Sequence, residues 1–89
     1  MKTCKRVLYT GLVQGVGFRQ TALHFSRRHP VTGFVRNLPN GQVELVAEGA
    51  PRDIDALLAD IAGRMGRNIE RMETEAMPLQ DFSTFEIRR

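Results

Sequence analysis

The sequence has few of the residues on which covalent or metal chemistry usually depends. Its 89 residues include one cysteine, Cys4, so no disulfide forms within the chain and no multi-cysteine metal site is possible. No window approaches the roughly 18 apolar residues of a membrane span, and no apolar run follows the basic N-terminus as in a secretory signal. We therefore expect a cytoplasmic protein that needs no metal or other cofactor and has no membrane partner.

A strong excess of charge of one sign is also missing. Thirteen Lys and Arg against ten Asp and Glu give a net charge of +3. This balance mildly favours anionic ligands and is too weak to indicate a nucleic-acid partner. The apolar share of 42% and the charged share of 26% are ordinary for a globular protein. A chain of this length buries one modest core, so we expect residues 1–89 to form a single domain and to act as a monomer.

Residue patterns predict an alternation of strands and helices. Strands are indicated at residues 5–13, 31–38, 42–48, 69–77 and 82–88, the fourth being charged enough for a sheet edge. Phe18, Ala22 and Phe25 recur at helical spacing before Pro30, and a second apolar helical stripe follows Pro51. This order predicts an α+β fold of the ferredoxin-like, split βαβ type. Two helices would cover one face of an antiparallel sheet of four to five strands.

Three local features add detail to this picture. Asn40-Gly41 lies between two predicted strands and is a strong hairpin signal, because both residues tolerate positive φ. On the next strand Glu44 and Glu48 alternate with apolar residues, which is typical of a strand with one solvated face. Cys4 lies near the N-terminus, where we expect the chain to fray and the thiol to have no role.

The stretch VQGVGFR, residues 13–19, places two glycines and an arginine where a strand gives way to a helix. Glycine allows a loop to turn through positive φ and lets backbone N–H groups approach a ligand. The start of the helix adds a partial positive charge, and Arg19 adds a planar fork that matches phosphate oxygens. The loop alone leaves two interpretations equally open: a site for a small anion, or an ordinary turn followed by a solvated arginine. The Walker and dinucleotide-binding motifs are both absent.

Two longer stretches in register resemble a known family. GLVQGVGFR, residues 11–19, is similar to the signature of the acylphosphatases, and GFVRNLPNGQVELVAEG, residues 33–49, resembles their second signature. The resemblance extends from about Arg6 to Arg88. It departs from the family pattern at Phe34, where tryptophan is usual, at Asn40, where aspartate is usual, and in the run RRHPVTG after the first helix.

The resemblance implies a ferredoxin-like sandwich that hydrolyses carboxyl-phosphate mixed anhydrides without a metal. By position, Arg19 becomes the arginine that binds phosphate, and Asn37 becomes the residue that orients the attacking water. The phosphate cradle would consist of Gln14, Gly15, Val16, Gly17, Phe18 and Arg19. The implied partners are a small acyl phosphate and, as a competing anion, inorganic phosphate or sulfate.

The sequence fits this chemistry because the reaction requires neither a general acid nor a strong general base. The leaving group is a carboxylate whose conjugate acid has a pKa near ~4, so it leaves without a proton. Phosphoryl transfer relies mainly on positioning and electrostatic stabilisation. Two other functions remain open at this stage. One is a non-catalytic module of ferredoxin-like fold that binds an anion or RNA, and the other is a regulatory acylphosphatase-like domain.

Overall fold

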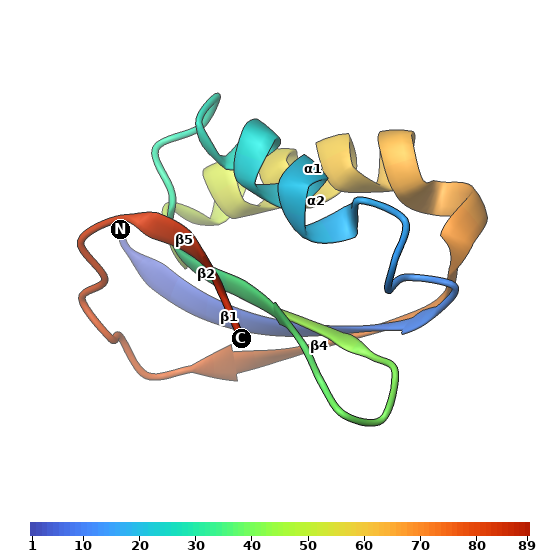
Figure 1. Ribbon diagram of the computed structural model, residues 1–89. Coiled ribbons are helices and arrows are strands. Elements are labelled where there is room, and N and C mark those ends of the chain that lie inside the picture. The colour runs from blue at the N-terminus through green and yellow to red at the C-terminus, as the bar shows by residue number, and fades with distance from the viewer.

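The computed structural model describes all of residues 1–89 and shows two helices lying across one face of a sheet (Figure 1). The elements are β1 (Thr3–Gly11), α1 (Phe18–Ser26), β2 (Thr32–Asn37), β3 (Val43–Gly49), α2 (Pro51–Met65), a 3₁₀ turn (Gly66–Asn68), β4 (Ile69–Met77) and β5 (Phe85–Arg88). The strands follow the order β4-β1-β3-β2-β5 across the sheet. The predicted α+β, ferredoxin-like sandwich is therefore confirmed. None of the helices is both long enough and apolar enough to cross a membrane.

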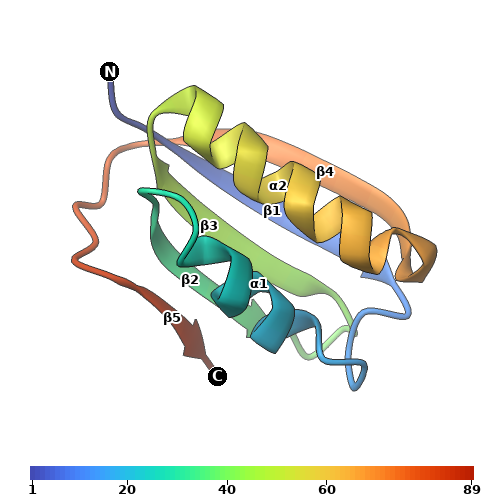
Figure 2. The same cartoon turned by 90° about the horizontal axis from the view of Figure 1, so that it is seen from above.

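The sheet differs from the prediction in one pairing. β1, β2, β3 and β4 pair in antiparallel fashion, but β5 lies parallel to β2, with Gly33 opposite Phe85. The sheet is mixed, and the prediction of a wholly antiparallel sheet was wrong. The reason lies in residues 78–84, which leave β4 at one edge and reach the opposite edge at the same end of the sheet (Figure 2). β5 must then run opposite to β4, and so in the direction of β2.

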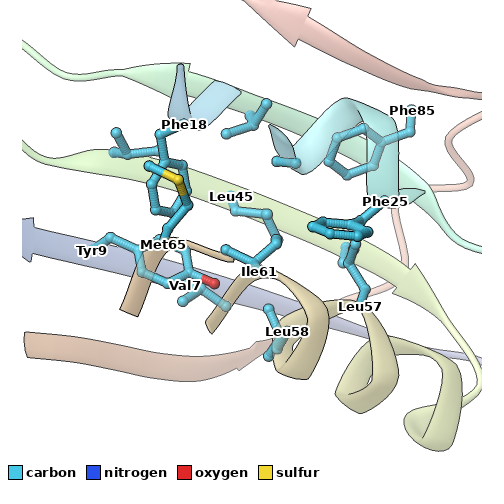
Figure 3. Packing of buried hydrophobic residues seen from close by; sticks show 14 of the residues in the cluster. Val7, Tyr9, Phe18, Phe25, Leu45, Leu57, Leu58, Ile61, Met65 and Phe85 are labelled. Carbon is cyan, nitrogen blue, oxygen red and sulfur yellow. The ribbon is translucent and has the colours of Figure 1, made fainter. Parts of the chain in front are cut away.

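An apolar core fills the space between the sheet and the helices (Figure 3). Its main members are Val7 and Tyr9 of β1, Val35 of β2, Val43, Leu45 and Ala47 of β3, Phe18, Ala22 and Phe25 of α1, and Ile54, Leu57, Leu58, Ile61 and Met65 of α2. Fully burying a side chain such as Leu or Phe stabilises the fold by about 1.5–3 kcal/mol. Phe18 is the first residue of α1, and its ring centroid lies 4.7 Å from that of Tyr9. The core therefore fixes the N-terminus of α1, and with it the backbone of Arg19, the second residue of the helix.

Several boundaries differ from those predicted. β1 begins at Thr3, two residues before the predicted start, and Cys4 within it is only 3% exposed. The expectation that the chain frays at Cys4 was therefore wrong. α1 ends at Ser26, ahead of Pro30, and β5 is confined to Phe85–Arg88.

The open face of the sheet carries a buried ion-pair cluster around Glu44. The Nε atoms of Arg6 and Arg36 donate to its two carboxylate oxygens, at 2.5 Å and 2.6 Å respectively. Burial alone would raise the pKa of Glu44, but the two guanidinium groups outweigh burial and hold this pKa below its ordinary value. The expectation that Glu44 is solvated was wrong, because the long side chains of neighbouring strands cover it.

Glu48, on the same face, is also buried. Its carboxylate accepts hydrogen bonds from the backbone N–H groups of Gln80, Asp81 and Phe82 at 2.6, 3.2 and 3.1 Å, and lies 3.4 Å from Lys2 Nζ. Burial opposes ionisation, but the three N–H groups prevail and hold the pKa of Glu48 below its ordinary value. Glu48 was thus also wrongly expected to be solvated. It ties the segment that leads into β5 to the central strand β3.

These two carboxylates predict a loss of stability in acid. Because the pKa of each is lower in the folded chain than in the unfolded chain, their contribution is complete above the ordinary glutamate pKa of about 4.3. It is lost as the pH falls from there through the folded values. Glu48→Gln cannot ionise, so we expect it to be less stable at pH 7 and to lose less stability between pH 5 and pH 3. Urea unfolding at each pH checks this, and equal acid-induced losses in parent and variant would contradict it.

Candidate active site

The loop between β1 and α1 owes its shape to two glycines. Gly15 has a φ of 76° and Gly17 a φ of 82°. This left-handed region costs other residues roughly 1–2 kcal/mol. A Cβ atom at either position would meet no atom within 4 Å, so the requirement for glycine comes from the backbone angle and not from crowding. The loop therefore turns sharply and leaves open space beside its backbone.

The N–H groups of this loop and of the first helical turn are free to bind an anion. Those of residues 15–20 take part in no backbone hydrogen bond, and Gly17 provides no side-chain cap for α1. The N-terminus of a helix carries about half a positive elementary charge, concentrated on such N–H groups. A run of unpaired donors beside that charge is a favourable environment for an anion.

Arg19 and Asn37 line one hollow of about 160 Å³. Its walls are Val13, Gly15, Gly17, Phe18, Arg19, Gln20, Asn37 and Ile87. They meet there because β1, β2 and β5 end at the same end of the sheet, where α1 begins (Figure 2). The fold thus brings five of the predicted residues to one place: Gly15, Gly17, Phe18, Arg19 and Asn37.

Two of the three polar side chains that line the hollow, those of Arg19 and Asn37, are without a protein partner. No carboxylate lies within ion-pairing distance of the guanidinium of Arg19. Asn37 is the last residue of β2, and its Oδ1 is buried without a hydrogen bond. Leaving a buried acceptor unpaired costs about 1–3 kcal/mol, and such a group in a native protein calls for an explanation. In this hollow, a water or ligand donor would satisfy it.

Two residues of the predicted cradle do not line the hollow. Val16 points to solvent, with 42% of its surface exposed. Gln14 donates from Nε2 to the carbonyl oxygens of Leu38 and Gln42, at 2.8 and 2.9 Å. Its side chain is therefore engaged with the β2–β3 hairpin.

Sequence reasoning missed three residues of the hollow. Val13 and Gln20 flank the predicted cradle of residues 14–19, so their place beside it could have been read from the sequence. Ile87 could not, because it arrives on β5, whose position beside β2 depends on the path of residues 78–84.

The hollow suits one kind of chemistry. It offers one guanidinium, several N–H donors and one buried acceptor, and no carboxylate, histidine or cysteine lines it. The chain has no group of three or more His, Cys, Asp or Glu that could hold a metal ion. Such a set can bind a tetrahedral anion and hold one water beside it. It has no strong base or nucleophile.

Comparison with known proteins gives a consistent result. Residues 5–87 match the family model described as Acylphosphatase. A protein named Acylphosphatase from Anaeromyxobacter dehalogenans is 42% identical over 85 residues, which cover 93% of this chain and 91% of the relative. Another from Pseudomonas aeruginosa is 41% identical over 90 aligned residues, covering 99% and 98%. The crystal structure of acylphosphatase from Bacillus subtilis has a TM-score of 0.87 at 23% identity and full coverage of both chains, a likeness that speaks to the fold alone.

Proposed function

The chain belongs to the acylphosphatase family, and from this premise we propose that it hydrolyses acyl phosphates in the hollow between α1, β2 and β5. The products are a carboxylate and inorganic phosphate. The observation that carries the proposal is the convergence of Arg19 and the unpaired Oδ1 of Asn37 beside the uncapped N-terminus of α1.

In this proposal the phosphoryl group is held by backbone and arginine together. The N–H groups of residues 15–20 and the fork of Arg19 bind its non-bridging oxygens. Donors fixed in place before the reaction stabilise the charge of the transition state without reorganising, which is usually the largest electrostatic gain in catalysis. Gly15 and Gly17 provide the backbone shape, and Phe18 anchors the helix from the core side.

Asn37 positions the attacking water. Its Oδ1 accepts a hydrogen bond from a water that attacks phosphorus in line with the leaving oxygen. A bond forms between the water oxygen and phosphorus as the bond from phosphorus to the carboxyl oxygen breaks. The carboxylate leaves with the bonding electron pair, and the proton of the water passes to solvent. The leaving group needs no acid, since its conjugate acid has a pKa near ~4.

The same site explains what the enzyme should not do. An alkoxide leaving group needs a proton or a metal, and the hollow contains no acidic side chain that could supply a proton. Alkyl phosphates should therefore be poor substrates. Family membership favours this enzyme over a non-catalytic module that binds an anion or RNA.

Three finer points belong to the proposal. Inorganic phosphate or sulfate should compete with substrate, because each presents the same oxygens to the loop. The protein should act as a monomer of one domain, since its large exposed apolar residues are scattered along the chain: Met1, Leu12, Val16, Met72 and Leu79. We place it in the cytoplasm, where a single cysteine stays reduced.

Phosphate release from acetyl phosphate tests the proposed function. We expect turnover by the purified chain with little loss in excess chelator, and no detectable release from an alkyl phosphate such as phosphoserine. Turnover of acetyl phosphate that disappears with chelator and returns with Mg²⁺ or Zn²⁺ would contradict the mechanism. Absence of turnover under all these conditions would contradict the function.

A further inference from the structure

Gln14 joins two segments that carry different parts of the proposed machinery. It directly precedes Gly15 in the loop, and both of its hydrogen bonds from Nε2 go to the β2–β3 hairpin. One acceptor is the carbonyl of Leu38, the residue after Asn37. The other is the carbonyl of Gln42, where the chain turns back into β3. The amide thus spans the mouth of the hairpin from the side of the loop.

The hairpin has its own internal bracing. Gly41 N–H donates to the carbonyl of Leu38 at 3.1 Å, and Gln42 N–H donates to Oδ1 of Asn40 at 3.0 Å. The side chain of Gln42 also reaches Oγ1 of Thr10 on β1, at 2.9 Å. These bonds make the turn stiff, and the bond to Thr10 fixes its last residue, Gln42, to β1. Only Gln14 ties it by a side chain to the loop that carries the glycines.

We propose that Gln14 is a positioning residue, which fixes Asn37 against the loop of residues 15–19 and does not bind phosphate itself. The proposal rests on the function proposed above and deepens it. It reassigns Gln14 from the cradle predicted by the sequence, because both of its donor hydrogens are already used on carbonyl oxygens. A glutamine amide has only those two donors.

The two hydrogen bonds from Gln14 to the hairpin, here called the clamp, matter because the reaction depends on alignment. Water held by Asn37 must lie in line with a phosphoryl group held by the loop. A misplacement of about 1 Å at such a site costs up to a hundredfold in rate. Without the clamp the hairpin remains folded through its own bonds, while its distance from the loop becomes less well defined. The loop and Arg19 keep their shape, so phosphate binding should be nearly unaffected.

Gln14→Met tests this directly, because methionine has a similar length and no donor. We expect kcat on acetyl phosphate to fall about ten- to thirtyfold, with the inhibition constant for inorganic phosphate within about twofold of the parent. The matched control is Gln80→Met, which removes a similar bond, from Nε2 to the carbonyl of Pro78 at 3.0 Å, in an exposed segment. The control should match the parent in both measurements.

Two results would overturn the proposal. Loss of phosphate affinity equal to the loss of kcat would make Gln14 a phosphate ligand. A kcat within twofold of the parent would make the clamp a structural contact only. The double variant Gln14→Met/Asn37→Ala adds a sharper criterion, since Gln14 should act through Asn37. Its kcat should equal that of Asn37→Ala alone, and multiplication of the two losses would refute the coupling.

Amide NMR on the unmodified protein tests the same point without turnover and without any variant. During titration with inorganic phosphate, the backbone signals of residues 15–19 should move most, while the side-chain NH₂ signals of Gln14 stay nearly fixed. Large shifts of the Gln14 NH₂ signals would contradict the clamp. Because this readout is independent of catalysis, failure of the clamp and failure of the proposed function remain distinguishable.

Discussion

Asn37→Ala should lower kcat for acetyl phosphate about a hundred- to a thousandfold and leave the affinity for inorganic phosphate close to that of the parent. The proposed contact from Asn37 is made to the attacking water, so it contributes to the transition state and hardly to the bound phosphate. Losing one preorganised polar group of this kind costs on the order of 3–4 kcal/mol of transition-state stabilisation.

The fold should tolerate this change well. Oδ1 of Asn37 is buried and unpaired, so its removal takes away a desolvation cost and no hydrogen bond. The melting temperature should therefore be equal to or above that of the parent. If Asn37 were merely a support for the turn, the opposite pattern would appear: early melting with kcat of the folded fraction within a few-fold of normal.

Asn40→Ala is the matched control for this prediction. Asn40 lies in the same hairpin and makes two hydrogen bonds to Gln42, from Nδ2 to Oε1 and from the backbone N–H of Gln42 to Oδ1. Its loss should weaken the turn and leave kcat within a few-fold of the parent. Measuring kcat, phosphate inhibition and the melting curve on both variants separates support of the turn from a role in the reaction. A collapse of kcat in Asn40→Ala equal to that in Asn37→Ala would contradict the assignment.

The sequence predicted the layers of this fold because they depend on local patterns. The apolar stripes around Phe18 and along α2 indicate helices by themselves, and the Asn40-Gly41 pair marks the hairpin. Only Gly41 of that pair takes a positive φ, at 93°. The direction of β5 had no such signal, since it depends on how residues 78–84 cross the end of the sheet.

The misjudged glutamates show a different limit of sequence reasoning. Alternation shows which residues share a face, but not whether anything covers that face. Glu44 is covered by arginines from β1 and β2, and Glu48 by three backbone N–H groups from residues 80–82. Arg36 lies directly opposite Glu44 across the hairpin, only eight residues away. Arg6 and residues 80–82 are more than thirty residues from the glutamates that they contact, and no pattern around the glutamates indicates them. The burial of both carboxylates therefore depends largely on tertiary packing.

The candidate site also combines local features, which the sequence indicates, with contacts that depend on tertiary packing. The glycines of the loop and the position of Arg19 are local features, and the sequence placed them correctly beside the start of α1. The side-chain role of Gln14 was not predictable from the motif, because its acceptors belong to a hairpin that the sheet brings alongside. Ile87 was not predictable either, because the pairing of β5 with β2 brings it to the hollow. The roles proposed for Arg19, Asn37 and Gln14 stay predictions, which variants at these three positions test.

Arg19→Lys should give a signature that differs from that of Asn37→Ala, because phosphate affinity and turnover should fall together. Lysine keeps the charge but replaces a planar fork by a point charge on a flexible stem, so one of two oxygen contacts is lost. A hydrogen bond to a charged group is worth about 1.5–3 kcal/mol, which corresponds to a loss of roughly ten- to a hundredfold in both quantities. The melting temperature should not change, since Arg19 makes no ion pair in the fold.

Arg52→Lys is the control for this exchange, since Arg52 is exposed near the start of α2 and lies outside the hollow. It should match the parent in kcat, in phosphate inhibition and in melting temperature. The deciding comparison is the inhibition constant for phosphate across the two site variants. Arg19→Lys should raise it and Asn37→Ala should not, because one residue holds the phosphoryl group and the other holds the water. Near-normal turnover and phosphate affinity in Arg19→Lys would show that the backbone N–H groups bind the anion without the fork, and the role assigned to Arg19 would be wrong.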